Sequence, residues 1–459
     1  MNSMNLDCLA GETLDRDGKT RETYRRITRR LFPFFLFCYT LAYLDRVNIG
    51  FAQLQMKRDL AFSDAVYGLG AGIFFIGYIL LEVPSNMILR RIGARRTMTR
   101  IMILWGLLSA AMMFVKTPTQ FYSLRLLLGM AEAGFLPGMV LFFTFWFPPQ
   151  RRATMMNVAT LGSCIAGVIG GILSGLVMRY CDGARGLAGW QWMFLAEGLP
   201  AVAMGIVTWF YLSDEPDSAR WLNDEQKAIL KQDLQQERVE NGPPPGRNEI
   251  VVALRKPGVY VLSIVYFCLN AGIYTLGFWI PTIIKSFGVT DLLHISVYAS
   301  VPYTFGAITM TFMSRSSDRH RERRWHFAVP MTLGALALVL LTMTTKSFPM
   351  SMLLITLAFP LIFGLVPIFW AAASAWLGDS IKASGIALIS SLGSIGAFAS
   401  PAILGWLKTQ TGSLASGFYL VALAMVVSAV LMVVAISRAS LSNSSRVTLA
   451  RIRPNQRRI

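Results

Sequence analysis

The stretch "LAYLDRVNIGFA", residues 41–52, closes an apolar run that begins near Leu31. Runs of this kind recur along the whole chain, each close to the ~20 residues that a helix needs to cross a bilayer. Hydrophobic residues make up 54% of the 459 residues and charged residues only 15%, whereas soluble domains carry about 25% charged residues. Because the runs are continuous and do not alternate, the sequence predicts a helical multi-pass membrane protein and argues against a β-barrel.

Twelve such runs predict an all-α membrane protein of 12 transmembrane helices. The predicted spans cover residues 29–51, 66–88, 97–115, 121–145, 153–178, 191–212, 258–284, 295–313, 326–345, 350–377, 384–407 and 417–437. The longest polar segment separates the sixth span from the seventh. We therefore expect a cytoplasmic tail, a first six-helix bundle, a cytoplasmic linker, a second six-helix bundle and a basic cytoplasmic tail, at residues 1–28, 29–212, 213–257, 258–437 and 438–459.

The basic residues decide the orientation of these spans. Of the 43 lysines and arginines, 33 fall in the two tails, the linker and the connections on the same side, eight fall on the other side, and two lie inside spans. Short loops rich in Lys and Arg stay in the cytoplasm, so both termini are expected there. The net charge of +18 follows this pattern. No basic face with interleaved aromatic residues is visible, so we expect no nucleic-acid partner.

The sequence offers no motif for a cofactor or a metal. The five cysteines form no CxxC pair, and the three histidines are scattered along the chain. No hydrolase or redox constellation is present, so an enzyme is not expected. The first 28 residues are polar and lack the apolar core of a cleavable signal peptide.

The two halves echo each other in sequence. Pro137 and Pro367 are 230 residues apart, as are Trp146 and Trp376. Each half has an even number of spans, so the two repeats would run parallel and be related by an axis along the membrane normal. Transporters built in this way bind their substrate near mid-membrane, at the interface between the repeats.

Four ionisable residues stand deep inside predicted spans: Asp45 and Arg46 in the first span, and Arg125 and Glu132 in the fourth. A charge at the bilayer centre costs about 3 kcal/mol on insertion scales, so such residues face a partner or a watery cavity. Arg125 and Glu132 are two helical turns apart on one face, roughly 10 Å along the axis. Tyr43 and Arg46 also share a face, while Asp45 lies about 100° away and could meet a neighbouring helix.

These residue types favour anion binding linked to protons. An arginine fork matches a carboxylate with two hydrogen bonds and stays protonated at working pH, so two arginines in one cavity suit an organic anion. Asp45 and Glu132 could carry protons, and an acid that loses its proton could pair with an arginine and compete with the substrate. The alternative is two structural ion pairs that hold helices together. Glu82 and Glu197, nearer the ends of their runs, are weaker candidates.

Aromatic and hydroxyl side chains give further candidates for a ligand cavity. Tyr78 precedes Glu82 by one turn, and Trp370 and Ser374 share a face of the tenth span. Trp370 could contact an organic ligand through its ring. Packing between helices is the alternative for the two aromatic residues.

Five stretches together resemble one family. They are "YLDRVNIGFA" (43–52), "EVPSNMILRRIGARR" (82–96), "RLLLGMAEAGFLPGMVLFFTFWFP" (125–148), "GWQWMFLAEGLPA" (189–201) and "SDRHRERR" (317–324). With them, the whole chain resembles the major facilitator superfamily, and within it the anion:cation symporter family of bacterial carboxylate permeases.

The resemblance implies a monomeric transporter in the bacterial cytoplasmic membrane. The proton gradient would be its driving force, and no cofactor would be needed. Its substrate would be a small organic acid, either a tartrate-like hydroxy acid or an aromatic acid such as hydroxyphenylacetate. The position-by-position roles would be carboxylate contact for Arg46 and Arg125, proton linkage for Asp45 and Glu132, and pocket lining for Tyr43 and Tyr78. Anion exchange, sodium coupling and a non-transporting nutrient sensor are the alternatives.

Two regions depart from the pattern of the family or superfamily. The eleventh span has Ser390 and Ser394 in the segment where relatives often have asparagines. The loop between the second and third spans lacks the usual aspartate of the superfamily's gating motif, whereas Asp318 keeps the corresponding acid in the second half. The remaining residues that we assign to these cytoplasmic motifs are Arg90, Arg91, Arg95, Arg96 and Arg323.

Overall fold

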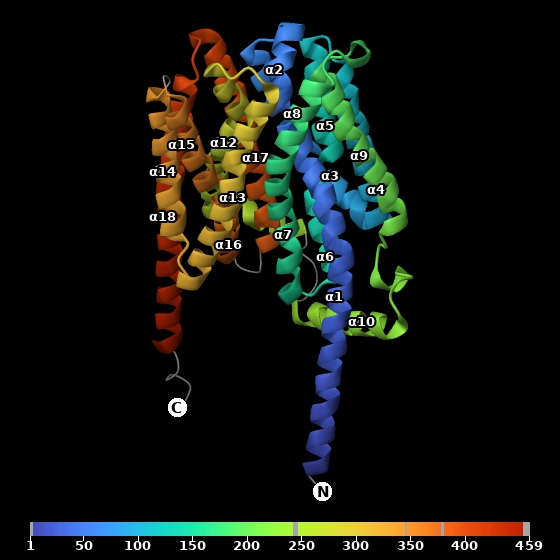
Figure 1. The fold of residues 1–459 in the computed structure, drawn as a ribbon. Coiled ribbons are helices and arrows are strands. Elements are labelled where there is room, and N and C mark those ends of the chain that lie inside the picture. Colours follow the sequence, from blue (N-terminus) through green and yellow to red (C-terminus); the bar gives the residue numbers. More distant parts are fainter. Residues whose placement is uncertain (1–2, 242–246, 345–346, 378–380, 453–459) are drawn as a thin grey trace.

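The computed structural model of the protein describes residues 3–241, 247–344, 347–377 and 381–452, in which the regular elements are all helices (Figure 1). The first half contains α1 (Ser3–Val47), α2 (Ile49–Leu60), α3 (Asp64–Ile92), α4 (Ala94–Ala111), α5 (Pro118–Glu132), α6 (Phe135–Trp146), α7 (Pro149–Ile165), α8 (Gly171–Tyr180) and α9 (Gly189–Tyr211). The second half contains α12 (Pro257–Ser286), α13 (Leu292–His320), α14 (Arg324–Met343), α15 (Phe348–Phe363), α16 (Leu365–Leu377), α17 (Lys382–Thr411) and α18 (Ala415–Ile452). The segment between the halves forms α10 (Asp224–Asn241) and α11 (Arg247–Leu254).

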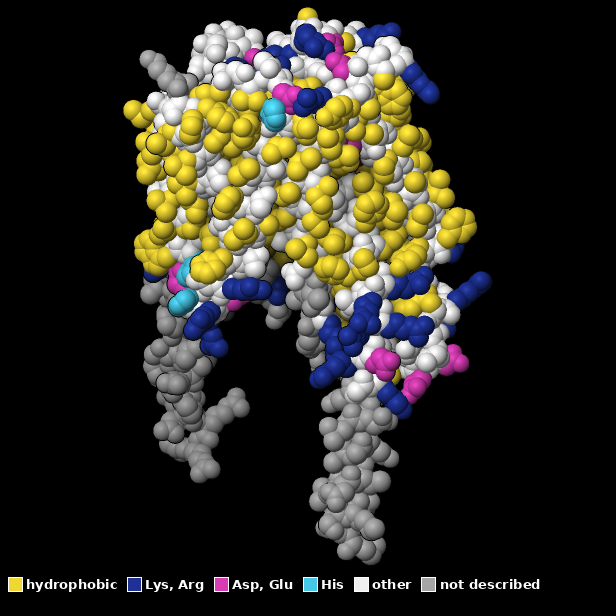
Figure 2. Space-filling view, viewed as in Figure 1, with side chains coloured by type: hydrophobic (Ala, Val, Ile, Leu, Met, Phe, Trp, Pro, Cys, Tyr) yellow, Lys and Arg dark blue, Asp and Glu magenta, His cyan; other side chains and the backbone are white. Residues whose placement is uncertain are grey.

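The helices account for the twelve predicted spans. Ten helical stretches in the described residues are long and apolar enough to cross a membrane. The other two spans are α1 with α2, where Asp45 and Arg46 interrupt the apolar run, and α13, which carries several serines and threonines. On the face drawn in Figure 2, a broad belt of hydrophobic side chains lies between Lys and Arg side chains at the top and a larger group of them below, toward the end that carries both termini.

Three of these spans break in the middle. The first span breaks at Asn48, between α1 and α2. The fourth and tenth break at Gly134 and Gly364, which are separated by the same 230 residues as the sequence repeat. Gly134 has a φ of +88°, a left-handed conformation that glycine adopts without steric cost. The span predicted for 121–145 is therefore confirmed, within the stretch Pro118–Trp146, but it consists of two helices, and the break places Glu132 at the end of α5.

The fifth span is also irregular. A π turn, Ala166–Gly170, joins α7 to α8. Such turns are rare and often lie at functional sites. This one packs against α13 of the second half, where the ring of Tyr303 lies so close to Gly167 that a Cβ atom there would be 2.0 Å from it.

The two halves meet mainly at the end opposite the termini. There Gln53 donates to Thr282 Oγ1 (2.6 Å), Tyr67 donates to the Phe278 carbonyl (3.0 Å), and Lys285 Nζ donates to the Leu54 carbonyl (3.0 Å). Arg179 and Asp291 add an ion pair between α8 and the start of α13 (2.6 Å).

Toward the termini the two halves separate, and Figure 2 shows a recess between them. In the described part of the chain, the cross-half hydrogen bond farthest from the closed end joins Ser391 Oγ to Glu82 Oε2 (3.2 Å). Since the positive-inside pattern assigns this open end to the cytoplasm, the structure has the shape of an inward-facing transporter.

The described part of the linker packs against the first half. In α10, Asp233 accepts a hydrogen bond from the Tyr24 hydroxyl (3.1 Å), and Glu225 pairs with Lys19 (3.1 Å). Trp221, which precedes α10, stacks on Trp146 with ring centres 5.5 Å apart. These contacts hold the first part of the linker against the cytoplasmic end of the first bundle.

Candidate functional site

Arg46 and Glu132 form a buried ion pair in the first half. Arg46 lies near the end of α1 and is 8% exposed, and Glu132 ends α5 and is fully buried. The Arg46 Nε donates to Glu132 Oε1 (2.8 Å), and Arg46 Nη2 donates to the same oxygen (2.5 Å). The other oxygen of Glu132 is buried and has no hydrogen bond in the described structure. Both donors of the Arg46 guanidinium therefore bind the same oxygen of Glu132, and the second carboxylate oxygen can still accept a hydrogen bond.

Arg125 does not pair with Glu132, although both lie on one face of α5. Its side chain crosses to α3, where Nε donates to the Gly70 carbonyl (3.1 Å) and Nη2 to the Ala71 carbonyl (3.4 Å). The guanidinium lies 5.0 Å from the ring centre of Phe74. Arg125 is fully buried, and its Nη1 has no hydrogen-bond partner. Two helix carbonyls and a ring face hold this cation, and one donor is still unused.

Asp45 lies on a different face of α1 from its neighbour Arg46, about 100° away around the helix axis. It accepts a hydrogen bond from Ser109 Oγ of α4 (2.6 Å) and a longer one from Asn48 Nδ2 (3.4 Å). The second Asp45 oxygen is buried without a hydrogen bond, and the indole N–H of Trp105 faces the carboxyl group outside hydrogen-bond geometry. No salt bridge joins Asp45 to a basic side chain in the described residues. The two neighbours therefore lie in different environments, one paired with a charge and one with neutral donors.

The sequence analysis missed part of this polar cluster. Asn48 reaches Glu197 Oε2 (2.9 Å), and Ser174 lies 2.7 Å from Glu197 Oε1. Glu197 is 2% exposed, so it belongs to the interior of the first half rather than to a helix end. The signal in the sequence was the run of three polar residues, Asp45 to Asn48 with one valine between, because an amide next to a buried acid needs a partner.

Aromatic rings of both halves surround Arg46. The Arg46 guanidinium lies 5.0 Å from the ring centre of Tyr78, and the Tyr274 hydroxyl of α12 reaches it from the second half. Tyr43 is also buried and faces toward Tyr303 and Tyr274. Arg46 is thus the one of the two buried arginines that contacts both halves, which suits a residue at the repeat interface.

The other side of this interface is aromatic and uncharged. Tyr266 stacks on Phe369 and meets Trp370 edge-on, both with ring centres 4.9 Å apart. Asn270, a residue that sequence reasoning did not single out, donates to the Gly393 carbonyl (3.1 Å). Of the predicted residues in this half, Trp370, Ser374 and Ser390 are half-buried, and the Ser390 carbonyl accepts from Ser394 Oγ (2.8 Å).

The predicted cytoplasmic motif is dispersed in the first half and paired in the second. Arg91 and Arg96 are exposed, and the side chain of Arg90 lies outside the described residues. Arg95 lies 4.8 Å over the Trp209 ring, and its backbone N–H donates to Asp214 Oδ1 (2.8 Å). Asp214, at the start of the linker, therefore supplies a carboxylate at the start of α4. In the second half Arg323 pairs with Asp318 (2.5 Å) and also donates to Ser317 Oγ (3.0 Å).

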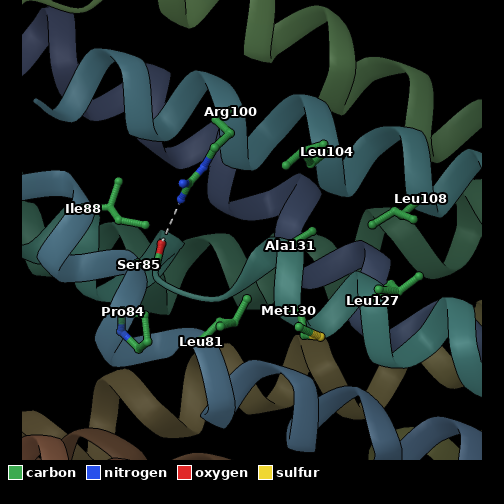
Figure 3. A pocket seen from close by; sticks show the side chains of 10 residues that line it. All are labelled: Leu81, Pro84, Ser85, Ile88, Arg100, Leu104, Leu108, Leu127, Met130 and Ala131. Atoms are coloured by element: carbon green, nitrogen blue, oxygen red, sulfur yellow. Dashed lines mark hydrogen bonds between the residues drawn. The ribbon is translucent and has the colours of Figure 1, made fainter. Parts of the chain in front are cut away.

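A pocket of about 300 Å³ lies away from this site, between α3, α4 and α5 (Figure 3). Its walls are mostly apolar, and they include Leu81, Leu104, Leu127 and Met130. One polar contact crosses it, from Arg100 to Ser85 Oγ (3.4 Å). Leu104 and Leu127 are about half exposed on the membrane-depth surface, so this pocket faces the lipid region and does not hold the buried charges.

Two parallel helical halves around buried charges, open at one end, define a multi-pass membrane transporter. The chain belongs to the Major Facilitator Superfamily, which matches residues 35–375. No group of three His, Cys, Asp or Glu side chains that could hold a metal ion is found among the described residues.

Individual relatives agree with this family. The chain is 43% identical to a protein of Agrobacterium vitis named "Putative tartrate transporter", over 95% of this chain and 99% of that protein. It is 42% identical to "Putative metabolite transport protein NicT" of Pseudomonas putida, over 91% and 95% of the two chains. The fold is similar to the crystal structure of a D-xylose-proton symporter, with a TM-score of 0.69, 13% identity and coverage of 88% and 96%.

Proposed function

We propose that this transporter imports a small organic carboxylate together with protons, through alternating access, across the bacterial cytoplasmic membrane. The observation that carries the proposal is the ion pair between Arg46 and Glu132. It is buried at membrane depth, next to the interface of the two halves, and Tyr274 of the second half reaches the same arginine. The names of the two relatives, "Putative tartrate transporter" and "Putative metabolite transport protein NicT", support the choice of an organic anion.

The pair links proton and anion binding through competition for one guanidinium. An ionised Glu132 occupies the Nε and Nη2 donors of Arg46, which are the donors that a substrate carboxylate would use. A proton on Glu132 removes the charge that holds them, so the fork becomes free for the substrate. When Glu132 releases the proton to the cytoplasm, it competes again and favours release of the anion. In this order, substrate binds when Glu132 is protonated and leaves after Glu132 has lost its proton in the cytoplasm, so the proton gradient drives inward transport.

Arg125 would supply the second positive charge. Its unused Nη1 donor and the field of its guanidinium favour an anion nearby, while its bonds to two α3 carbonyls hold it in place. Substrate would then be held between a mobile cation, Arg46, and a fixed one. One copy of the chain contains every residue of this scheme, so the transporter is proposed to act as a monomer.

Uptake of labelled L-tartrate and labelled 4-hydroxyphenylacetate into proteoliposomes tests the proposal. With an acidic outside medium, the protein should accumulate at least one of the two anions above its external concentration, and a protonophore should abolish that accumulation. Protein-free liposomes are the control. Uptake that persists unchanged without the proton gradient, but requires an anion inside the vesicle, would replace symport by exchange, and a dependence on sodium would replace the coupling ion.

A further inference from the structure

Glu197 is a buried carboxyl group that the proposed mechanism does not use. It lies in α9, in the interior of the first half, and each of its oxygens has one polar neighbour. Ser174 Oγ of α8 is 2.7 Å from Oε1, and Asn48 Nδ2, at the break between α1 and α2, is 2.9 Å from Oε2. No salt bridge joins Glu197 to a Lys, Arg or His side chain in the described part of the chain. An ionised carboxylate without a cation is costly in such a place, so the group is expected to hold a proton for part of its time.

The hydroxyl group of Ser174 has one hydrogen to donate, and two oxygen atoms lie within hydrogen-bond distance of it. Besides Glu197 Oε1, the Gly170 carbonyl oxygen lies 2.9 Å from Ser174 Oγ. A serine hydroxyl donates one hydrogen bond at a time and accepts others. If Glu197 is protonated, it donates to Ser174, and Ser174 donates to Gly170, so both contacts are satisfied. If Glu197 is ionised, Ser174 must turn to the carboxylate, and the Gly170 carbonyl loses this bond.

Gly170 closes the π turn of the fifth span, and this turn touches the second half. The turn comprises Ala166–Gly170 and packs on α13. The Tyr303 ring lies against Gly167, and the Ser296 side chain lies against Gly175 one turn beyond. A change in the hydrogen bond at Gly170 therefore acts on the contact surface between the two halves, which must slide when the transporter changes state.

Among the described residues, one other acid, Asp45, interacts with Glu197. Helix α9 packs on α4, α8, α1 and α2, and of the titratable groups on these helices, Asp45 is the one that acts on Glu197. Asn48 connects the two, through one short contact to Glu197 and one long contact to Asp45 (3.4 Å). Two acids bridged by a neutral amide disfavour double ionisation, because their charges repel each other in a medium of low dielectric constant.

We propose that Glu197 is a further proton-binding site of the first half, besides the acids assigned to proton linkage, and that its proton decides whether Ser174 donates its hydrogen to the carboxyl group or to the Gly170 carbonyl of the π turn. The inference rests on the proposed function only for the use of this proton in symport. Occupancy of the site itself is a property of the protein without substrate.

Infrared difference spectroscopy tests the site directly. The full-length protein in lipid vesicles is compared at low and high pH, in H2O and in D2O, and the signal is the carbonyl stretch of a protonated carboxylic acid. The Glu197→Gln variant keeps an amide donor for Ser174 and should lose one such band. The matched control is Glu225→Gln, which removes a carboxyl group that is exposed on α10 and should leave the buried-acid bands in place. A Glu197→Gln spectrum that superimposes on the wild-type spectrum across the pH range overturns the proposal.

A pair of serine variants tests the link to the π turn. Ser174→Ala removes the hydroxyl group between Glu197 and Gly170. Ser263→Ala is the control, because Ser263 is buried and donates to the carbonyl four residues earlier (2.8 Å), with no hydrogen bond to a carboxylate among the described residues. The readout is the pH profile of substrate counterflow, and size-exclusion elution verifies that both variants are folded.

We expect Ser174→Ala to displace this profile and Ser263→Ala to retain it. Equal profiles for the two variants would remove the link to the π turn. The proposed function can fail separately, since wild-type uptake that ignores the proton gradient would end the symport proposal while leaving the infrared result on Glu197 unaffected.

Discussion

The two halves of the transporter share an architecture and differ in chemistry. Both carry a glycine break at equivalent positions, Gly134 and Gly364. Glu132 is the last residue of α5, and Arg125 lies two helical turns before it. The residues 230 positions later are Ile355 and Ile362, which are both fully or almost fully buried. Among the described residues, the buried charged side chains all lie in the first half.

This difference teaches that the repeat preserves the positions of these glycines and not the charged site. Of the two glycines, Gly134 has a left-handed φ, whereas Gly364 keeps helical dihedral angles. The buried charges lie in the first half, because an ion pair in an interior of low dielectric constant needs a complete set of partners, and these partners lie there. The second half contributes rings, serines and Asn270 instead, and so forms an uncharged wall opposite Arg46.

The largest effect is expected from Asp45→Asn, which removes a protonatable group while it keeps the shape of the side chain. Asparagine can still accept from Ser109, so counterflow exchange should remain largely intact. Proton-driven accumulation should be lost, because Asp45 is assigned to proton linkage together with Glu132, and Glu132 alone would remain. Labelled uptake with and without a pH gradient measures both, with the exposed Asp217→Asn as the control. Accumulation against a gradient in Asp45→Asn would remove Asp45 from the coupling.

Ile362→Glu tests the comparison from the side of the second half. It places an acid at the position that corresponds to Glu132; Ile362 is fully buried, and no buried arginine is found among the described residues of the second half. The cost of the unpaired group should be about 3 kcal/mol, the scale for a charge in a membrane helix. Thermal unfolding in detergent should therefore begin at a clearly lower temperature, whereas Ile362→Val should change it little. A variant as stable as wild type would show that the second half can accommodate a charge.

Arg46→Lys should weaken transport in every mode by a factor of roughly 10 to 100. Lysine keeps the charge and loses the two-pronged donor that now holds Glu132, and a hydrogen bond to a charged group contributes about 1.5–3 kcal/mol. Initial uptake and counterflow rates measure the effect. Arg58→Lys, a change at an exposed arginine, serves as the control. Wild-type rates in Arg46→Lys would mean that charge alone, without the fork, is sufficient.

The smallest effect is expected from Ser391→Ala, which removes the cross-half hydrogen bond to Glu82. A single hydrogen bond of this kind contributes about 1 kcal/mol, so the balance between the inward- and outward-facing states should change about fivefold. Accessibility labelling of a cysteine placed in the open end would detect the change. If labelling is unchanged in Ser391→Ala but clearly changed in Ser174→Ala, the conformational equilibrium is controlled at α8 and α13 rather than at α3 and α17.

The helices were predictable because each depends on its own stretch of sequence. Long apolar runs must be helical in a bilayer, since every backbone polar group has to be satisfied internally. The breaks were less accessible. A glycine such as Gly134 occurs in many unbroken helices, and only packing against α3 and the left-handed φ at this position reveal the end of α5.

The buried charges of the site were also visible in the sequence, but their partners were not. Arg125 and Glu132 share a face of α5, yet Arg125 turns to the carbonyl groups of α3 and Glu132 turns to Arg46 of α1. Glu197 lies in the interior of the first half, and the sequence does not reveal this, because the distance from the end of an apolar run says little about burial among neighbouring helices.

The sequence by itself determined the number of spans, the side on which basic loops gather and the identity of the charged residues inside the membrane. These follow from local hydropathy and from the cost of a lone charge in lipid. Only the tertiary structure decided which charge meets which partner. Arg46 binds Glu132, 86 residues away, while the adjacent Asp45 binds Ser109, 64 residues away. Neighbours in the chain lie on different faces of one helix, and helix packing alone brings each face to its own partner.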